Sequence, residues 1–224
     1  MGKKSWKARA VTAVVMTGLM GFSAHAQDTM SAQDKAQMKQ GKAVGEAAAK
    51  RTKYVGKVAL FNNRQIELAR VAEEQASDPR VKQFATQLRE DHEKSQESLR
   101  SWAKSKQMEV SALSENTSAG QGMGGSGMQQ GFNENMENAG EKVGRHSDET
   151  RAEVNKLRSM HGPEFDKAFL SRIADDQKKG KSLLEEGRKD YKNDATFLAL
   201  LSDTEGMVSS NETKAKELEK QVKK

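Results

Sequence analysis

A histidine occupies the middle of an apolar helical stripe between Ser77 and Met108. The stripe consists of Val81, Ala85, Leu88, His92, Ser95, Leu99 and Trp102, which follow one another in steps of four and three residues. This spacing places all of them on one face of a single helix. An imidazole can bind a transition metal or form hydrogen bonds through both ring nitrogens. Because its neighbours on the stripe are mostly apolar, His92 is expected to be buried and to need a partner from another helix.

Three other helices each carry a polar residue among apolar ones. Asp176 lies on the inner face of a helix predicted to begin at Pro163, and Asn211 lies in the apolar seam of the last helix. Glu67 lies among the apolar positions of a helix predicted over residues 53–76. Since Glu is seldom buried without a partner, a solvated carboxylate on the outer face is the simpler interpretation of Glu67.

Three methionines, Met123, Met128 and Met136, lie in a glycine-rich segment at residues 114–145. Thioether ligands favour Cu(I), but the spacings between these methionines are irregular and nothing local holds their sulfur atoms together. The segment contains eight of the 18 Gly residues and almost no large apolar side chain. It cannot bury enough surface to offset the entropy of ordering it. We therefore predict a long disordered Gly/Met-rich loop rather than a copper site.

The remaining periodicity predicts an all-α protein with four long helices. They cover residues 53–76, residues 77–108, a segment from Pro163 to the turn at 191–194, and the segment after this turn as far as residue 222. A short extra helix is predicted at 147–159. The long connection between the second and third long helices allows a crossover, so the architecture expected is a ferritin-like four-helix bundle.

The ends of this bundle define the domain organisation that the sequence predicts. Residues 27–52 are expected to be a polar lead-in, partly helical at best. A single domain then covers residues 53–222, interrupted by the flexible insertion at 114–145. No Cys is present, so no disulfide stabilises the fold and helix packing alone must do so.

Residues 1–26 have the pattern of a signal peptide. A basic start precedes a short apolar run from Ala10 to Phe22, and Ala24 and Ala26 occupy the positions that a signal peptidase reads. A membrane-spanning helix needs about 20 apolar residues, and this run is shorter. An uncleaved anchor is the alternative; we predict cleavage near Ala26. The mature protein would then have no transmembrane segment and would lie in the periplasm or at the outer membrane.

Charge and motif content argue against several classes of function. The leader holds four of the 38 Lys and Arg residues and none of the 32 Asp and Glu residues, so the mature chain has a net charge of only +2. Without a clustered basic face that carries aromatic residues, nucleic-acid binding is not expected. No Ser-His-Asp arrangement, phosphate-binding loop or metal-hydrolase motif is present, so the sequence predicts no enzymatic activity.

Three segments carry a family pattern. They read QIELARVAEEQASDPRVKQFATQLREDHEKSQESL, FDKAFLSRIADDQKKGKSLLEE and, more faintly, NETKAKEL. Over roughly residues 53–112 and 147–219 the chain resembles the bacterial exported family numbered 4142 among the domains of unknown function. The resemblance implies a ferritin-like four-helix bundle. It also implies an exported protein of a family often labelled as outer-membrane, so that peripheral attachment to the envelope stays open.

The family resemblance also implies a set of site residues. The family has a Glu in the first helix and a His in each of the next three; Glu67 and His92 match, whereas Asp176 and Asn211 occupy the other two positions. Glu67, His92 and Asp176 would be the ligands of a metal-binding or redox site. However, Arg89 stands where di-iron proteins have a Glu three residues before the His, and two imidazoles are replaced. The preferred interpretation is a polar layer of Glu67, His92, Asp176 and Asn211 in the bundle core.

These observations predict an exported helical module that binds a partner or serves in stress tolerance, and that is not an enzyme. Its partners are unknown from sequence, and a transition metal is the cofactor only in the metal-binding or redox alternative. If His92 is charged and pairs with Asp176, its pKa should be raised, and the pairing should stabilise the fold at low pH.

Overall fold

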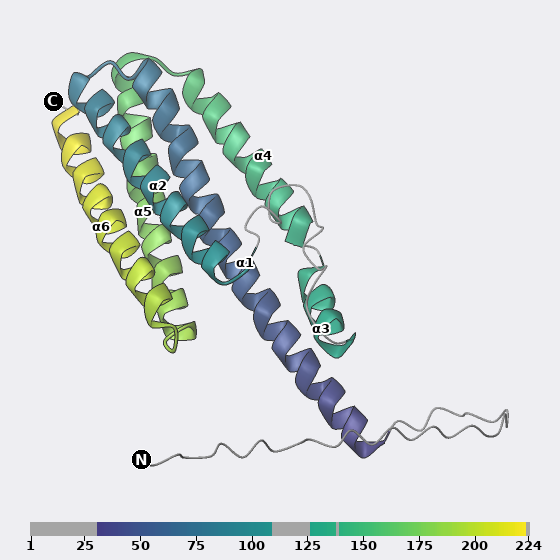
Figure 1. Ribbon diagram of the computed structural model, residues 1–224. Coiled ribbons are helices and arrows are strands. Elements are labelled where there is room, and N and C mark those ends of the chain that lie inside the picture. Colours follow the sequence, from purple (N-terminus) through teal and green to yellow (C-terminus); the bar gives the residue numbers. More distant parts are fainter. Residues whose placement is uncertain (1–30, 109–125, 138, 223–224) are drawn as a thin grey trace, which may run out of the picture.

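The computed structural model describes residues 31–108, 126–137 and 139–222, and these ranges contain six helices and no strand (Figure 1). The helices are α1 (Ala32–Gln75), α2 (Pro79–Ser105), α3 (Ser126–Met136), α4 (Ala139–Arg158), α5 (Gly162–Asp190) and α6 (Ala195–Val222). None of them is both long enough and apolar enough to cross a bilayer. The predicted signal peptide at residues 1–26, with its cleavage site at Ala24 and Ala26, lies outside the described residues.

Four helices pack side by side around a common core: the second half of α1, α2, α5 and α6 (Figure 1). Helix α1 contacts α2 and α5, and α6 contacts the same two helices from the opposite corner. The start of α2 lies against the start of α5, since the Asp78 backbone N–H donates to Asp166. At the other end, Lys106 after α2 pairs with Asp194 after α5. Helices α2 and α5 therefore run in the same direction, and α3 and α4 form the crossover between them.

Local signals explain where these helices begin. The Asp78 carboxylate accepts a hydrogen bond from the Arg80 backbone N–H, with Pro79 at the first helical position of α2. Pro163 occupies the first turn of α5 in the same way. The Asp194 carboxylate accepts from the Phe197 backbone N–H over 3.1 Å and caps α6. The starts predicted for these three helices are confirmed.

The core consists of two apolar clusters on either side of a polar layer. One cluster includes Leu68, Leu88 and Phe169, and the other includes Val58, Leu99, and a Trp102 ring that stacks on Phe197 with centroids 4.0 Å apart. Every residue of the stripe predicted on α2 is buried, and so are the members of the last seam from Phe197 to Leu218. The periodicity therefore identified the buried faces correctly.

The structure differs from the prediction in two places, the first half of α1 and the segment that follows α2. Residues 32–52, expected to be a polar lead-in, form the first half of α1, which extends beyond the bundle (Figure 1). The flexible loop predicted over 114–145 is wrong for residues 126–136 and 139–145, which belong to α3 and α4. The rest of that segment that precedes residue 126 lies outside the described residues. The short helix predicted at 147–159 is the second half of α4.

Glycines explain why α3 packs on the extended part of α1. A Cβ atom on Gly45 would lie 2.0 Å from the backbone oxygen of Met128, and a Cβ on Gly131 would lie 2.3 Å from that of Lys42. Only glycine permits the two backbones to approach so closely. The contact also buries Phe132, which is 3% exposed. The glycines that suggested disorder instead allow two helices to touch.

Replacing Gly45 with Ala should separate α3 from α1, because the new methyl group meets backbone atoms that cannot rotate away. We expect hydrogen exchange of the α3 amides to accelerate by at least about ten-fold, measured by mass spectrometry. Gly144→Ala is the matched control, since a Cβ there has nothing within 4 Å. It should leave α3 exchange unchanged and stabilise α4 by about 0.5–1 kcal/mol. Unchanged α3 exchange in Gly45→Ala would refute the glycine-dependent contact.

Candidate functional site

The polar layer centres on His92, which is fully buried. Its Nδ1 lies 2.9 Å from Oδ1 of Asn62, and its Nε2 lies 2.9 Å from Nε2 of Gln177. An amide oxygen can only accept and an amide nitrogen can only donate, so Nδ1 carries the proton and Nε2 accepts from Gln177. Both ring nitrogens of a neutral imidazole are thereby satisfied.

The layer continues from His92 through amide and hydroxyl groups. Asn62 Nδ2 donates to Ser95 Oγ over 3.2 Å and to Gln96 Oε1 over 3.3 Å. Gln177 Nε2 also donates to Gln65 Oε1 over 3.0 Å. These donors fix the amide orientations on either side of His92, and therefore fix its tautomer. The network links α1, α2 and α5 at one level of the bundle.

Burial lowers the pKa of His92 from its usual value near 6.5 to about 3. The cationic form would have to leave water and would have no carboxylate against either ring nitrogen. The expectation of a charged His92 with a raised pKa is therefore wrong, and the neutral ring is the form that the layer holds.

Asp176 lies at the edge of this layer and does not contact His92. Its Oδ2 accepts from Arg64 Nε over 2.8 Å and from Gln65 Nε2 over 3.5 Å. The neighbouring Gln177 makes the contact predicted for Asp176. Both positions face inward, because residues three and four after Ile173 lie on the same side of a helix.

Asn211 and Glu67 lie outside the layer. Asn211 donates to Asp91 Oδ2 over 3.2 Å, whereas α6 reaches the layer through Thr204, whose Oγ1 lies 3.4 Å from Ser95 Oγ. Glu67 is exposed and accepts from Arg70 over 2.9 Å. The structure agrees with the interpretation of Glu67 as a solvated carboxylate on the outer face of α1.

The arrangement does not bring the predicted ligand set together. Glu67 faces solvent, Asp176 pairs with Arg64, and both nitrogens of His92 are hydrogen-bonded. In the described part of the chain, no three His, Cys, Asp or Glu side chains gather where they could hold a metal ion. A metal at His92 would first have to displace Asn62 or Gln177.

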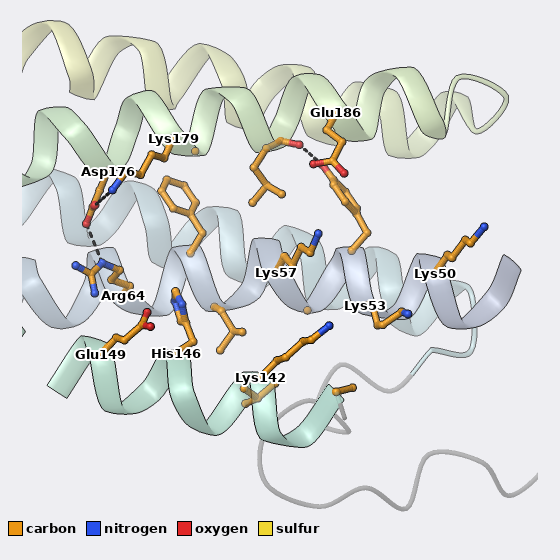
Figure 2. Close-up of a pocket in the computed structure, with 18 of the residues that line it drawn as sticks. Lys50, Lys53, Lys57, Arg64, Lys142, His146, Glu149, Asp176, Lys179 and Glu186 are labelled. Atoms are coloured by element: carbon orange, nitrogen blue, oxygen red, sulfur yellow. Dashed lines mark hydrogen bonds and ion pairs between the residues drawn. The ribbon is translucent and has the colours of Figure 1, made fainter. Parts of the chain in front are cut away.

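A groove of about 1420 Å³ runs between α1, α4 and α5 (Figure 2). It lies on the side of the bundle that α4 covers only partly. One end, which we call the lysine end, is formed by Lys50, Lys53 and Lys57 on α1 and by Lys142 on α4. Within the described ranges, none of these four ammonium groups lies within 4 Å of a carboxylate. Burial, and then the charges of Lys142, Lys50 and Lys57, lower the pKa of Lys53.

An apolar stretch adjoins the lysine end. Leu60 and Phe61 of α1, Val143 of α4 and Leu183 of α5 line it. Gly180 provides the room, since a Cβ there would lie 2.2 Å from the Phe61 ring. The groove thus places mobile positive charge beside an apolar surface.

The two arginines at the far end of the groove are paired. Arg64 bonds to Asp176, and Arg172 forms an ion pair with Glu153. The Arg172 guanidinium is the main reason that the pKa of Glu153 is lowered. Lys156 also lines that end and has no carboxylate within 4 Å in the described ranges, so unpaired positive charge is greatest at the lysine end but is not confined to it.

This groove was not predicted from the sequence. Lys142 and Val143 fall in the segment expected to be a disordered loop, and His146 lies just after it. The available signal was the helical spacing of Val143, Thr150, Val154 and Leu157, but the glycines before it suggested a loop. The amides of the polar layer, Asn62, Gln65 and Gln177, were missed because Asn and Gln are usually exposed.

Comparisons with known proteins place the chain in a family. No curated protein and no solved structure matches it. The model of one family, described as a domain of unknown function (DUF4142), matches residues 33–218, which include all six helices except the outermost turns of α1 and α6. The chain therefore belongs to the DUF4142 family.

Proposed function

We propose that this protein is an exported, non-enzymatic binding module and that its binding site is the groove between α1, α4 and α5. The ligand carries negative charge at one end and an apolar body. The observation that carries this proposal is the lysine end, where four ammonium groups without a carboxylate within 4 Å adjoin the apolar stretch. An anionic group placed there would gain charge-assisted hydrogen bonds, and its apolar body would cover Leu60 and Phe61.

Export and architecture are part of the proposal. The pattern of residues 1–26 supports secretion, with residence in the periplasm or at the inner face of the outer membrane. The bundle is of the ferritin-like kind: its two antiparallel hairpins joined by one long crossover are the arrangement typical of that class. In this view the polar layer has a structural role, because its amides and hydroxyls hydrogen-bond to one another and define the register of the helices, although Gln177 Oε1 is buried without a partner among the described residues.

A fluorescent aromatic sulfonate, 1-anilinonaphthalene-8-sulfonate, tests the proposed site. We expect saturable 1:1 binding to the purified protein, weakened about 10- to 100-fold in Lys53→Met/Lys142→Met because two charge-assisted contacts are lost. Lys94→Met, on the exposed face of α2, is the matched control and should bind like the original chain. The uncharged dye N-phenyl-1-naphthylamine should not distinguish the variants. Equal affinity of the sulfonate for the original chain and the double variant would refute the proposal.

A further inference from the structure

The unpaired positive charge of the groove lies mainly at one of its two ends. The lysine end lies at Lys50, Lys53, Lys57 and Lys142, whereas the two arginines at the other end are engaged by Asp176 and Glu153. Glu186 and Asp190 belong to the α5 wall of the groove, and Glu186 lies across the groove from Lys142 (Figure 2). A ligand with a single compact anionic head therefore has one preferred position, between α1 and α4.

The length of the groove fits an extended chain. From Lys53 to Arg64 the lining residues of α1 cover about 17 Å at 1.5 Å per residue. An extended chain advances about 3.6 Å for every three bonds, so this length suits an acyl chain of roughly 14 to 16 carbons. The chain would lie on Leu60, Phe61 and Leu183, with its terminal carbons near the paired cations.

Two other occupants fit less well. An acidic amphipathic helix needs cations along its whole length, and the arginines of the far end are already paired with carboxylates. A bilayer surface cannot enter a concave space between three helices, and the lysines there would not reach its phosphates together.

From this arrangement we infer that the groove binds a single long-chain fatty carboxylate, with its head at Lys53 and Lys142 and its chain along the apolar stretch. This inference rests on the proposed function of the groove. It adds the class of ligand and the direction in which the ligand lies.

Displacement of the bound aromatic sulfonate by octanoate, laurate and palmitate, each below its micelle concentration, tests the inference. Affinity should rise by up to about 250-fold for every four added carbons, because each fully buried methylene favours binding by about four-fold, and a rise of less than about ten-fold would refute burial of the chain. Palmitate should bind about 10- to 100-fold more weakly to Lys53→Met/Lys142→Met, whereas binding of the matched alcohol hexadecanol should not change between the two proteins. Leu60→Gln should flatten the dependence on chain length, and Lys94→Met should change nothing. Leu60 is only half-buried and lies outside both apolar clusters, so this variant should fold.

The outcomes separate this inference from the proposed function. If the sulfonate binds in a lysine-dependent manner and palmitate does not displace it, the site stands and the fatty carboxylate is refuted. Displacement by anionic phospholipid vesicles or by an acidic helical peptide, but not by palmitate, would also refute it. If neither the sulfonate nor palmitate binds, both proposals fail.

Discussion

Acidification from pH 6.5 to pH 4 is expected to lower the free energy of unfolding by about 3 kcal/mol through His92 alone. Burial lowers the pKa of His92 to about 3 in the folded protein, against about 6.5 in the unfolded chain. The unfolded chain therefore binds the proton first, and stability falls as pH drops below 6.5. The loss levels off only near the folded pKa. Above about pH 7.5 the ring is neutral in both states and contributes almost no pH dependence.

His92→Gln isolates this effect, because an amide does not titrate in this range and can still form hydrogen bonds in the layer. We expect the variant to be less stable at pH 7 but to lose about 3 kcal/mol less than the original chain between pH 6.5 and 4. Denaturant unfolding at a series of pH values measures both slopes. His161→Gln, at the exposed start of α5, is the matched control and should keep the original slope. Parallel slopes for His92→Gln and the original chain would show that His92 is not held neutral.

The sign of this prediction could not be obtained from the sequence. The 4-3 spacing on α2 correctly predicted that His92 is buried, because spacing within one helix defines which face is apolar. Its partners depend on the relative register of three helices, which periodicity within a single helix does not determine. Asp176 and Gln177 both face inward, and the charged Asp176 was the partner predicted for His92. The structure pairs His92 with the amide and leaves the carboxylate to Arg64.

The helices themselves were predictable wherever a cap or a proline marked their start. Asp78 with Pro79, Pro163, and Asp194 mark α2, α5 and α6, and each of these starts agrees with the structure. Composition gave a wrong prediction for the α1–α3 contact, where two helices pack backbone against backbone. At Gly45 and Gly131 the absence of a side chain is what stabilises the α1–α3 contact, whereas composition alone indicates a flexible segment.

The candidate site depends on α4, the first part of which was predicted from composition to be a disordered loop. Without α4 there is no wall opposite Lys53 and Leu60, and the lysines of α1 would be an ordinary solvated face. With α4 in place, Lys142 and His146 turn that face into a groove with one charged end. The polar layer and the groove also share a residue, since Asp176 borders both through Arg64 and Gln65. A ligand in the groove would therefore contact the α5 wall, which the polar layer helps to position.

Replacing Asp166 with Ala should lower the free energy of unfolding by about 2–4 kcal/mol. This buried carboxylate on α5 joins the start of α5 to the turn between α1 and α2. It accepts from the Ser77 backbone N–H over 2.9 Å, from Ser77 Oγ over 2.5 Å and from the Asp78 backbone N–H over 2.9 Å. Hydrogen bonds to a charged group contribute about 1.5–3 kcal/mol each, and Ala would leave two backbone donors without a partner.

Asp166→Asn should lie between Ala and the original chain, because the amide oxygen keeps one acceptor and Ser77 Oγ can accept from the amide nitrogen. Asp175→Ala, an exposed carboxylate on the same helix, is the matched control and should change stability by less than about 0.5 kcal/mol. Urea unfolding followed by circular dichroism provides the three values. Equal stabilities for Asp166→Ala and Asp175→Ala would mean that the turn is held by the packing of Val81 and Phe165 rather than by the carboxylate. Because the turn fixes the relative height of α1 and α5, its loss should also shift Gly180 away from Phe61. The sulfonate affinity of the groove should then fall in Asp166→Ala but not in Asp175→Ala.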